Sequence, residues 1–183
     1  MDVRAASKFM SYVLRHHPED IGLSLDENGW AEISSLVARA RQHHKPLSPK
    51  LIQEVIARSG KQRFIRSADG RYIRAGYGHS IDVDLQLTPC QPPNLLYHGT
   101  ARQHLSSIFA DGICARSRNF VHLSATEAEG RKVGRRHGRV VLLFVQAALM
   151  HENGHQLFQS QSESSIWLTQ HVPPEFISKE EPS

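Results

Sequence analysis

The sequence has 183 residues, 39% hydrophobic and 22% charged, and 22 Lys plus Arg against 18 Asp plus Glu leave a formal net charge of +4. This composition excludes a disordered chain, a collagen-like repeat and a disulfide scaffold, and it is typical of one or two globular domains. The longest uncharged apolar stretch, residues 140–150, falls short of the roughly 20 residues that a membrane helix needs. The first ten residues contain Asp2 and no apolar run, so we do not expect them to be a signal peptide. We therefore expect a cytoplasmic protein with no membrane contact, in which Cys90 and Cys114 stay reduced.

Three helices and a hairpin are predicted in the first half of the chain. Apolar residues at helical spacing predict one helix that ends near His16, a second over residues 33–40 and a third over residues 50–59. Ser48 and Pro49 form an N-terminal signal for the third helix, and Gly60 is a natural stop. Residues 63–67 and 71–75 flank Asp69-Gly70 and predict a β-hairpin. Three helices followed by a hairpin favour a winged-helix arrangement.

A Pro-rich segment, residues 88–94, divides the chain, because three prolines in seven residues continue neither a helix nor a central strand. After it, short strands are predicted at residues 95–98, 121–124, 157–159 and 165–169, with helices around residues 105–109 and 126–137. The apolar run at residues 140–145 is expected to be the central, buried strand. The whole sequence thus predicts an α+β protein with lobes at residues 1–87 and 95–183.

Charged residues cluster in one segment of the second half. Residues 115–139 carry seven basic and two acidic side chains. A basic segment of this kind usually forms a solvent-exposed face of the protein. The alternative is that it forms the rim of a phosphate-binding site.

Neither a dinucleotide-binding G-x-G-x-x-G motif nor a P-loop occurs in the sequence. Residues 151–155 match the H-E-x-x-H pattern of zinc proteases, which needs both His on one helical face. Asn153-Gly154 favours a turn inside the pentapeptide, so we expect an exposed loop and a chance match. His43-His44 is expected at a solvated helix end, and no metal site is predicted.

Six stretches, in order, resemble the NAD-dependent RNA 2′-phosphotransferase family. They are SKFMSYVLRHHP, KQRFIRS, YIRAGYGHS, LYHGT, RNFVHLSATEAEGRKVGRRHG and SSIWLTQHVPPEFI. The resemblance implies a winged-helix-like first lobe that binds RNA and phosphate, and a second lobe of ADP-ribosyltransferase type that binds NAD. The implied catalytic group is Arg15, His16, Arg63 and Arg118.

The resemblance also implies an NAD site at His98, Gly99 and Thr100, joined by His122 and Ser124 on the following strand. Gly78, His79 and Ser80 are expected near the RNA phosphate. Tyr77 stands where the family usually has Gln, so if that loop contacts RNA or phosphate, we expect its contacts to differ here.

The implied reaction removes the splice-junction type of 2′-phosphate from a tRNA-like RNA in two steps. The phosphate first attacks the nicotinamide ribose of NAD and displaces nicotinamide, which gives an ADP-ribosylated RNA. The ribose 2″-hydroxyl then attacks phosphorus and releases ADP-ribose 1″,2″-cyclic phosphate. Arg side chains suit a phosphate dianion because their forked donors bind its oxygens bidentately, and His16 is the expected proton carrier. We expect a monomer.

Two other functions remain open. An ADP-ribosyltransferase that modifies nucleic-acid ends or protein would need a late glutamate, and Glu163 is the available residue. A winged-helix DNA-binding regulator would need a basic recognition helix, whereas residues 50–59 carry only Lys50 and Arg58 against Glu54.

Overall fold

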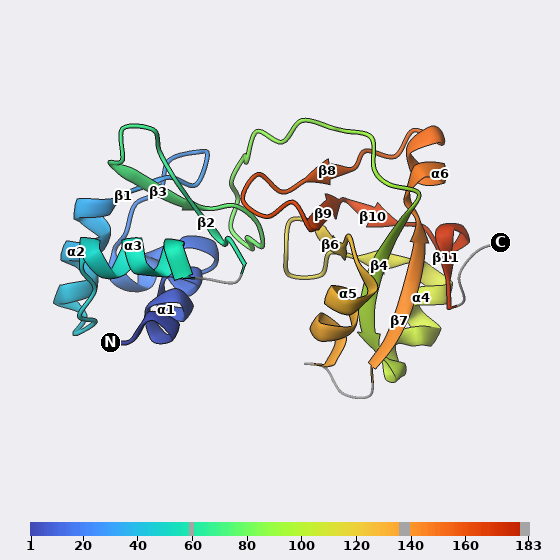
Figure 1. Ribbon diagram of the computed structural model, residues 1–183, viewed down its shortest axis with the longest axis horizontal. Helices are drawn as coiled ribbons and strands as arrows, with labels where there is room; N and C mark the ends of the chain where they lie inside the picture. Colours follow the sequence, from blue (N-terminus) through green and yellow to red (C-terminus); the bar gives the residue numbers. More distant parts are fainter. Residues whose placement is uncertain (59–60, 136–139, 180–183) are drawn as a thin grey trace. The chain divides into compact units, whose positions relative to one another are not determined.

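The computed structural model describes residues 1–58, 61–135 and 140–179, and the chain divides into two compact units, Met1–Gln86 and Leu87–Ser183 (Figure 1). Helices and antiparallel sheets occur in both units, so the α+β class predicted from the sequence is confirmed. None of the helices in these described ranges has the length and apolar character needed to span a membrane.

The first unit contains the three helices that the sequence predicted. They are α1 (Val3–Arg15), α2 (Ile33–Gln42) and α3 (Pro49–Arg58). Side-chain caps explain where two of them begin: Asp2 Oδ1 accepts from the Ala5 N–H at 2.7 Å, and Ser48 Oγ accepts from the Leu51 N–H at 3.2 Å. The predicted end of the third helix at Ser59 and Gly60 lies outside the described residues.

A small antiparallel sheet completes the first unit. Its strands are β1 (Ala31–Glu32), β2 (Phe64–Arg66) and β3 (Tyr72–Ala75), in the order β1-β3-β2. The predicted hairpin is confirmed, and Gly70 adopts the positive φ of 72° that its turn requires. The two-residue strand β1 was not predicted, because it is too short to show an alternating pattern.

The second unit is built on a six-stranded antiparallel sheet in the order β11-β7-β4-β6-β9-β8. In chain order its strands are β4 (Leu95–Ala101), β6 (Val121–Ser124), β7 (Val140–Gln146), β8 (Phe158–Gln159), β9 (Ile166–Thr169) and β11 (Ile177–Ser178). A separate pair joins β5 (Ile113–Cys114) to β10 (His171–Val172). The prediction that residues 140–145 form the central strand is wrong: β4 and β6 lie in the middle, and β7 lies between β4 and β11. Its apolar run reflects burial of Leu142–Val145, while its first two residues are half-buried.

The described residues of the second unit form the α-helices α4 (Leu105–Asp111), α5 (Glu127–Gly134) and α6 (Ala147–Glu152). Short 3₁₀ turns, η2 (Arg102–His104) and η4 (Pro174–Phe176), precede α4 and β11. The helix predicted over residues 126–137 is found as α5, which begins after its cap Thr126 and ends at Gly134. His137 lies outside the described residues.

The predicted linker, residues 88–94, forms no helix or strand. It is nevertheless fixed to the second unit, because the Cys90 N–H donates to the Leu157 carbonyl at 3.0 Å and Cys90 packs against that unit's core. Cys90 and Cys114 are both free thiols.

Candidate functional site

Arg15 and His16 occupy the C-terminal end of α1. Arg15 is the last helical residue, and His16 is the cap, whose N–H donates to the Tyr12 carbonyl at 3.0 Å. The preceding turn buries Val13 and Leu14 completely in the core of the first unit. Since these apolar side chains fix the last turn of the helix, the two polar residues that follow are held in a defined place.

The segment Tyr77–Ser80 returns to this helix end. The Arg15 guanidinium carbon lies 4.7 Å from the centroid of the Tyr77 ring, which is cation–π geometry. The Ser80 N–H donates to the Arg15 carbonyl at 3.0 Å, and the Ser80 hydroxyl lies 2.8 Å from His16 Nδ1. Gly78 allows the bend between these contacts, because its φ of 86° is strained for any residue with a Cβ. The segment therefore fixes both Arg15 and His16.

His79 lies within the same segment but is only 2% exposed. Burial, followed by the positive charges of Arg15, His16 and Arg74, lowers the pKa of His79 to about 4. Neither ring nitrogen has a hydrogen-bond partner among the described residues. A neutral, buried His79 thus supports the segment from inside the unit, and contact of residues 78–80 with RNA stays a prediction.

Arg63 directly precedes β2 and is half-buried. Its Nη1 donates to the Lys61 carbonyl at 3.4 Å, and its own carbonyl accepts from the Gly76 N–H at 3.0 Å. Gly76 is the residue before Tyr77. The five residues 76–80 therefore contact the backbone or side chain of all three site residues that were predicted in the first unit.

The second unit contains a cavity of about 450 Å³, a size typical of small-molecule sites. Among the residues that line it are His98, Gly99, Thr100, Arg116, Arg118 and His122. Five of these six were predicted from the sequence. Arg116 was missed as an individual residue, although it belongs to the basic segment noted there. Ser124, the remaining predicted residue, is buried further along β6 and is not among the residues that line the cavity.

His98, Gly99 and Thr100 lie inside β4, not in a turn after it, so the predicted end of this strand at residue 98 is wrong. The pairing with β7 continues to Ala101, opposite Val140. His98 Nδ1 donates to the His122 carbonyl at 3.3 Å, and His122 Nδ1 donates to the Phe120 carbonyl at 3.0 Å. Because a carbonyl only accepts, each neutral ring carries its proton on Nδ1 and has Nε2 as its acceptor.

A close contact between α5 and β4 shapes one wall of this cavity. A Cβ on Gly99 would lie 1.8 Å from the Gly130 carbonyl oxygen and 2.8 Å from the Gly134 nitrogen. Only glycine at position 99 lets the helix approach the strand this closely. Val133, on the same helix, lines the cavity.

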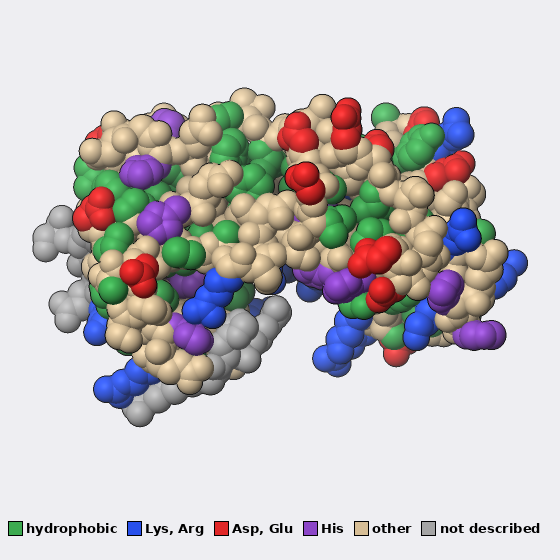
Figure 2. Space-filling view, turned by 180° about the vertical axis from the view of Figure 1, so that it is seen from behind, with side chains coloured by type: hydrophobic (Ala, Val, Ile, Leu, Met, Phe, Trp, Pro, Cys, Tyr) green, Lys and Arg blue, Asp and Glu red, His purple; other side chains and the backbone are tan. Residues whose placement is uncertain are grey.

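Cationic side chains gather at the exposed loop before β6. Arg116 and Arg118 are both exposed and both line the cavity, as does the half-buried His104. Figure 2 shows Lys and Arg side chains interspersed with acidic ones on the face that it displays, not joined in one broad basic surface over the described residues. The loop before β6 thus places two exposed arginines beside the cavity, where they can attract an anionic ligand.

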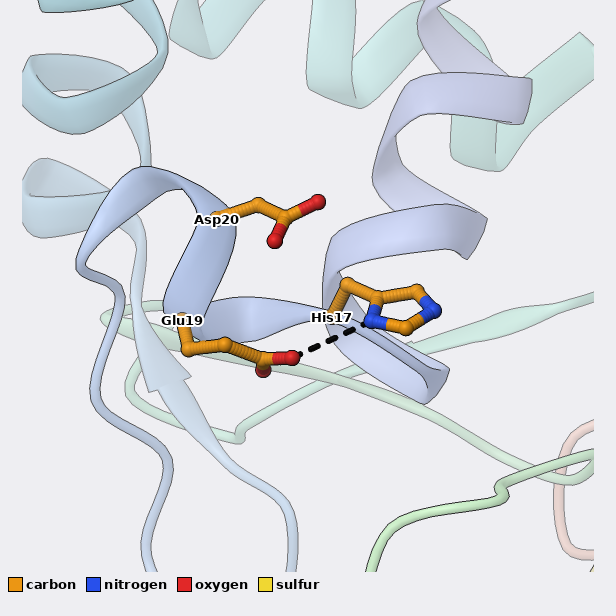
Figure 3. A group of neighbouring side chains, drawn as sticks. All are labelled: His17, Glu19 and Asp20. Carbon is orange, nitrogen blue, oxygen red and sulfur yellow. Dashed lines mark hydrogen bonds and ion pairs between the residues drawn. The ribbon is translucent and has the colours of Figure 1, made fainter.

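One group of His and acidic residues could hold a metal ion in the part of the chain that the structure describes: His17, Glu19 and Asp20. All three are exposed, and Figure 3 shows the Glu19 carboxylate pointing to the His17 ring, with Oε1 3.1 Å from Nδ1. Asp20 accepts a hydrogen bond from the Tyr12 hydroxyl. These contacts make the group an ordinary surface cluster at the end of α1.

The H-E-x-x-H match at residues 151–155 is interrupted by the end of a helix. The prediction of an exposed loop is wrong for His151 and Glu152, which form the last turn of α6, and His151 is half-buried. Asn153 caps the helix and Gly154 has a φ of 87°. His151 and His155 therefore do not share one helical face.

Glu163, the residue on which the ADP-ribosyltransferase alternative depended, lies in the loop before β9. Its Oε1 accepts from the Ser165 hydroxyl at 3.0 Å. It is not among the described residues that line the cavity.

Comparison with known proteins gives the family. Residues 1–171 match the family model "RNA 2'-phosphotransferase, Tpt1 / KptA family". A probable RNA 2'-phosphotransferase of Acaryochloris marina is 47% identical over 175 residues, which cover 96% of each chain. Proteins with the same name from Rhodopirellula baltica and Pseudomonas aeruginosa are 48% and 49% identical and cover 94% and 93% of each chain. With a match over nearly its whole length, this chain belongs to the RNA 2'-phosphotransferase, Tpt1 / KptA family.

Proposed function

We propose that this protein removes a 2′-phosphate from RNA by transferring it to NAD. The observation that carries the proposal is the fixed Arg15–His16 pair at the end of α1, in a chain that belongs to this family. Guanidinium and imidazole groups are the donors that bind and neutralise a phosphate dianion. Their attachment to residues 76–80 gives them the orientation that such chemistry needs.

The finer description of the fold is part of the proposal. Three helices with a β1-β3-β2 sheet support a winged-helix-like first unit. The antiparallel six-stranded sheet with α5 packed across β4 and β7 supports an ADP-ribosyltransferase-like second unit. Such a unit has no need of a G-x-G-x-x-G motif to bind NAD.

The cavity of the second unit fits NAD in size and in the chemistry of its walls. Its polar lining offers the imidazoles of His98 and His122 and the Thr100 hydroxyl to ribose hydroxyls, and Arg116 to a pyrophosphate. NAD, when bound, supplies the ribose that accepts the phosphate and carries nicotinamide as a leaving group. Gly99 lets α5 pack closely against β4, so the wall that they form is a rigid part of the cavity.

Each side chain has a proposed task. Arg15 and Arg63 bind oxygens of the RNA phosphate, and Arg118 neutralises charge that develops on the phosphate during transfer. His16 exchanges a proton with a substrate hydroxyl, since imidazole is the side chain best suited by its chemistry to general acid–base catalysis near neutral pH. Orientation by such groups lowers a barrier by up to about 7–11 kcal/mol. A tRNA-like substrate, a cytoplasmic location and a monomeric state stay predictions from the sequence.

A DNA-binding regulator is a weaker explanation. Arg58 Nη1 lies 3.9 Å from Glu54 Oε2 on α3, so one of the few cations of that helix faces an acid. A recognition helix is expected to present several unpaired cations to DNA.

The proposal is tested by incubating the protein with NAD and an oligoribonucleotide that carries one internal 2′-phosphate. We expect loss of that phosphate together with nicotinamide and ADP-ribose 1″,2″-cyclic phosphate. A 5′-phosphorylated oligoribonucleotide of the same sequence is the control and should remain unchanged. A folded protein that leaves the 2′-phosphate in place, or that modifies the 5′-phosphate instead, would overturn the proposal.

A further inference from the structure

Ser80 makes two hydrogen bonds to neighbouring residues at the end of α1. Its hydroxyl oxygen lies 2.8 Å from His16 Nδ1, and its backbone N–H donates to the Arg15 carbonyl at 3.0 Å. The backbone bond satisfies a carbonyl at the end of the helix, where intrahelical donors run out. The hydroxyl bond is different in kind, because it contacts the imidazole ring itself and therefore limits the ring's rotation.

We propose that Ser80 is a positioning residue, which holds the His16 ring so that Nε2, and not Nδ1, exchanges the proton with the RNA substrate. The proposal rests on the proposed function, and it changes the expected part of Ser80 from contact with RNA to support of His16. A neutral His16 would accept a substrate hydroxyl proton on Nε2 and become an imidazolium.

A serine hydroxyl suits both protonation states of the ring. When Nε2 is the nitrogen that takes up the proton, the neutral ring carries its own proton on Nδ1 and the imidazolium carries one there as well, so the Ser80 hydroxyl oxygen accepts from Nδ1–H in both states. The contact therefore persists while the proton moves at Nε2. A side chain that only donates would favour the tautomer with its proton on Nε2, which has no lone pair there to accept the substrate proton.

The surrounding residues show why this position, and not a neighbouring one, performs the task. Tyr77 contacts Arg15, and His79 is buried. Gly78, with its φ of 86°, bends the chain between them. Ser80 is exposed, so its hydroxyl meets the half-buried His16 ring at the surface of the unit.

Other charged and titratable groups also surround His16, so the test must isolate the hydroxyl. Arg15 precedes it, the His17 ring centroid lies 6.5 Å from its own, and the buried His79 interacts with it electrostatically. Ser80→Ala removes the hydroxyl and keeps the backbone bond to Arg15, whereas Ser80→Thr keeps both. Ser35→Ala is the matched control: it removes another exposed serine hydroxyl, one that bonds Glu32 at 3.2 Å on α2.

The first measurement is the ¹⁵N spectrum of the histidine side chains, which distinguishes Nδ1 from Nε2 protonation without substrate. We expect the His16 signals of Ser80→Ala to move relative to the wild type, and those of Ser80→Thr and Ser35→Ala to match it. The second measurement is single-turnover removal of the 2′-phosphate. We expect Ser80→Ala to slow it roughly tenfold or more, with the KM for NAD unchanged, and Ser80→Thr to restore most of the rate.

Two outcomes would overturn the inference. One is a Ser80→Ala variant with wild-type His16 signals and wild-type turnover. The other is a slow Ser80→Ala variant with unchanged His16 signals and no recovery in Ser80→Thr, which would mean that Ser80 acts elsewhere. If the wild type does not act on 2′-phosphorylated RNA, the proposed function fails, but the spectra still decide whether Ser80 orients His16.

Discussion

The guanidinium of Arg15 lies over the ring of Tyr77, with its central carbon 4.7 Å from the ring centroid. Tyr77 is buried, so water competes little with this contact. A partly desolvated cation–π pair contributes about 1 kcal/mol or more. The contact therefore holds Arg15, which is proposed to bind the RNA phosphate, against a buried residue of the first unit.

Replacing Tyr77 by Leu removes the aromatic face and keeps an apolar side chain. We expect kcat/KM for 2′-phosphorylated RNA to fall roughly fivefold or more, because Arg15 loses about 1 kcal/mol of orientation. Tyr77→Phe keeps the ring face and should stay near the wild type. Steady-state kinetics of the two variants checks this, and equal losses in both would argue that the hydroxyl, not the ring, is what matters.

His79 predicts a pH dependence of stability. Its pKa is about 4 in the folded protein, below the ordinary value of about 6.5 that it has when unfolded. As the pH falls from 6.5 toward 4, the unfolded chain takes up this proton and the folded chain does not, so stability is lost. The difference between the two pKa values corresponds to a loss of at most about 3 kcal/mol in the free energy of unfolding.

Urea denaturation between pH 4 and pH 7, followed by circular dichroism, checks that dependence. His79→Leu should flatten the fall in the free energy of unfolding over this range. His43→Leu changes an exposed imidazole and should keep the wild-type slope. A wild-type slope in His79→Leu would show that other groups produce the effect.

Gly99→Ala should destabilise the second unit strongly. The added Cβ meets the Gly130 carbonyl oxygen at 1.8 Å, so α5 must move away from β4, at a cost of about 3 kcal/mol or more. Gly154→Ala is the comparison: its φ is 87° but nothing lies within 4 Å, so only backbone strain of about 1 kcal/mol is expected. Unfolding followed by the fluorescence of the buried Trp167 measures both variants, and equal losses would contradict the close helix contact.

Arg118→Ala is expected to reduce the rate of phosphate transfer roughly 10²–10³-fold, the effect typical of removing one charge-stabilising donor from a transition state. Arg118→Lys should recover little, because lysine keeps the charge but lacks the planar fork. If an ADP-ribosylated RNA accumulates in Arg118→Ala, the residue acts after that species forms. If none accumulates, it acts earlier. An unchanged rate would show that Arg118 takes no part in phosphate transfer.

The H-E-x-x-H residues predict the result of metal removal. His151 and His155 lie on either side of the end of α6, so they do not form the protease metal site. Dialysis against EDTA should leave phosphate transfer unchanged, and His155→Ala should keep wild-type turnover. A loss that Zn²⁺ restores would contradict this.

Helices and hairpins with local signals could be predicted from the sequence. The cap at Ser48 and the Asp69-Gly70 turn each depend on residues next to one another, so their elements were placed correctly. The order of strands in the larger sheet is set by contacts between distant segments, and the run at residues 140–145 does not reveal its neighbours. The length of β4 likewise depends on pairing with β7, which no local pattern shows.

Sequence motifs indicated individual residues of the candidate site, but not the contacts between them. Arg15, His16 and Arg118 were identified through their motifs, but the role of Ser80 requires the bond to His16 across 64 positions of sequence. The burial of His79 could not be predicted either, because its small neighbours Gly78 and Ser80 form no apolar pattern around it. In the sequence, Arg116 is one of several cations in a basic segment. Its position at the cavity could not be predicted, because it depends on the folded structure.

The segment that follows β3 also has a consequence for synthesis of the chain. The partners described for Arg15, His16 and Arg63 all lie before residue 81, within a unit that has a core of its own. Domains generally fold as units, with the N-terminal one first, as the ribosome extends the chain. Arg15, His16 and Arg63 can therefore take their final arrangement on the nascent polypeptide, before translation has completed the strands that surround the cavity of the second unit.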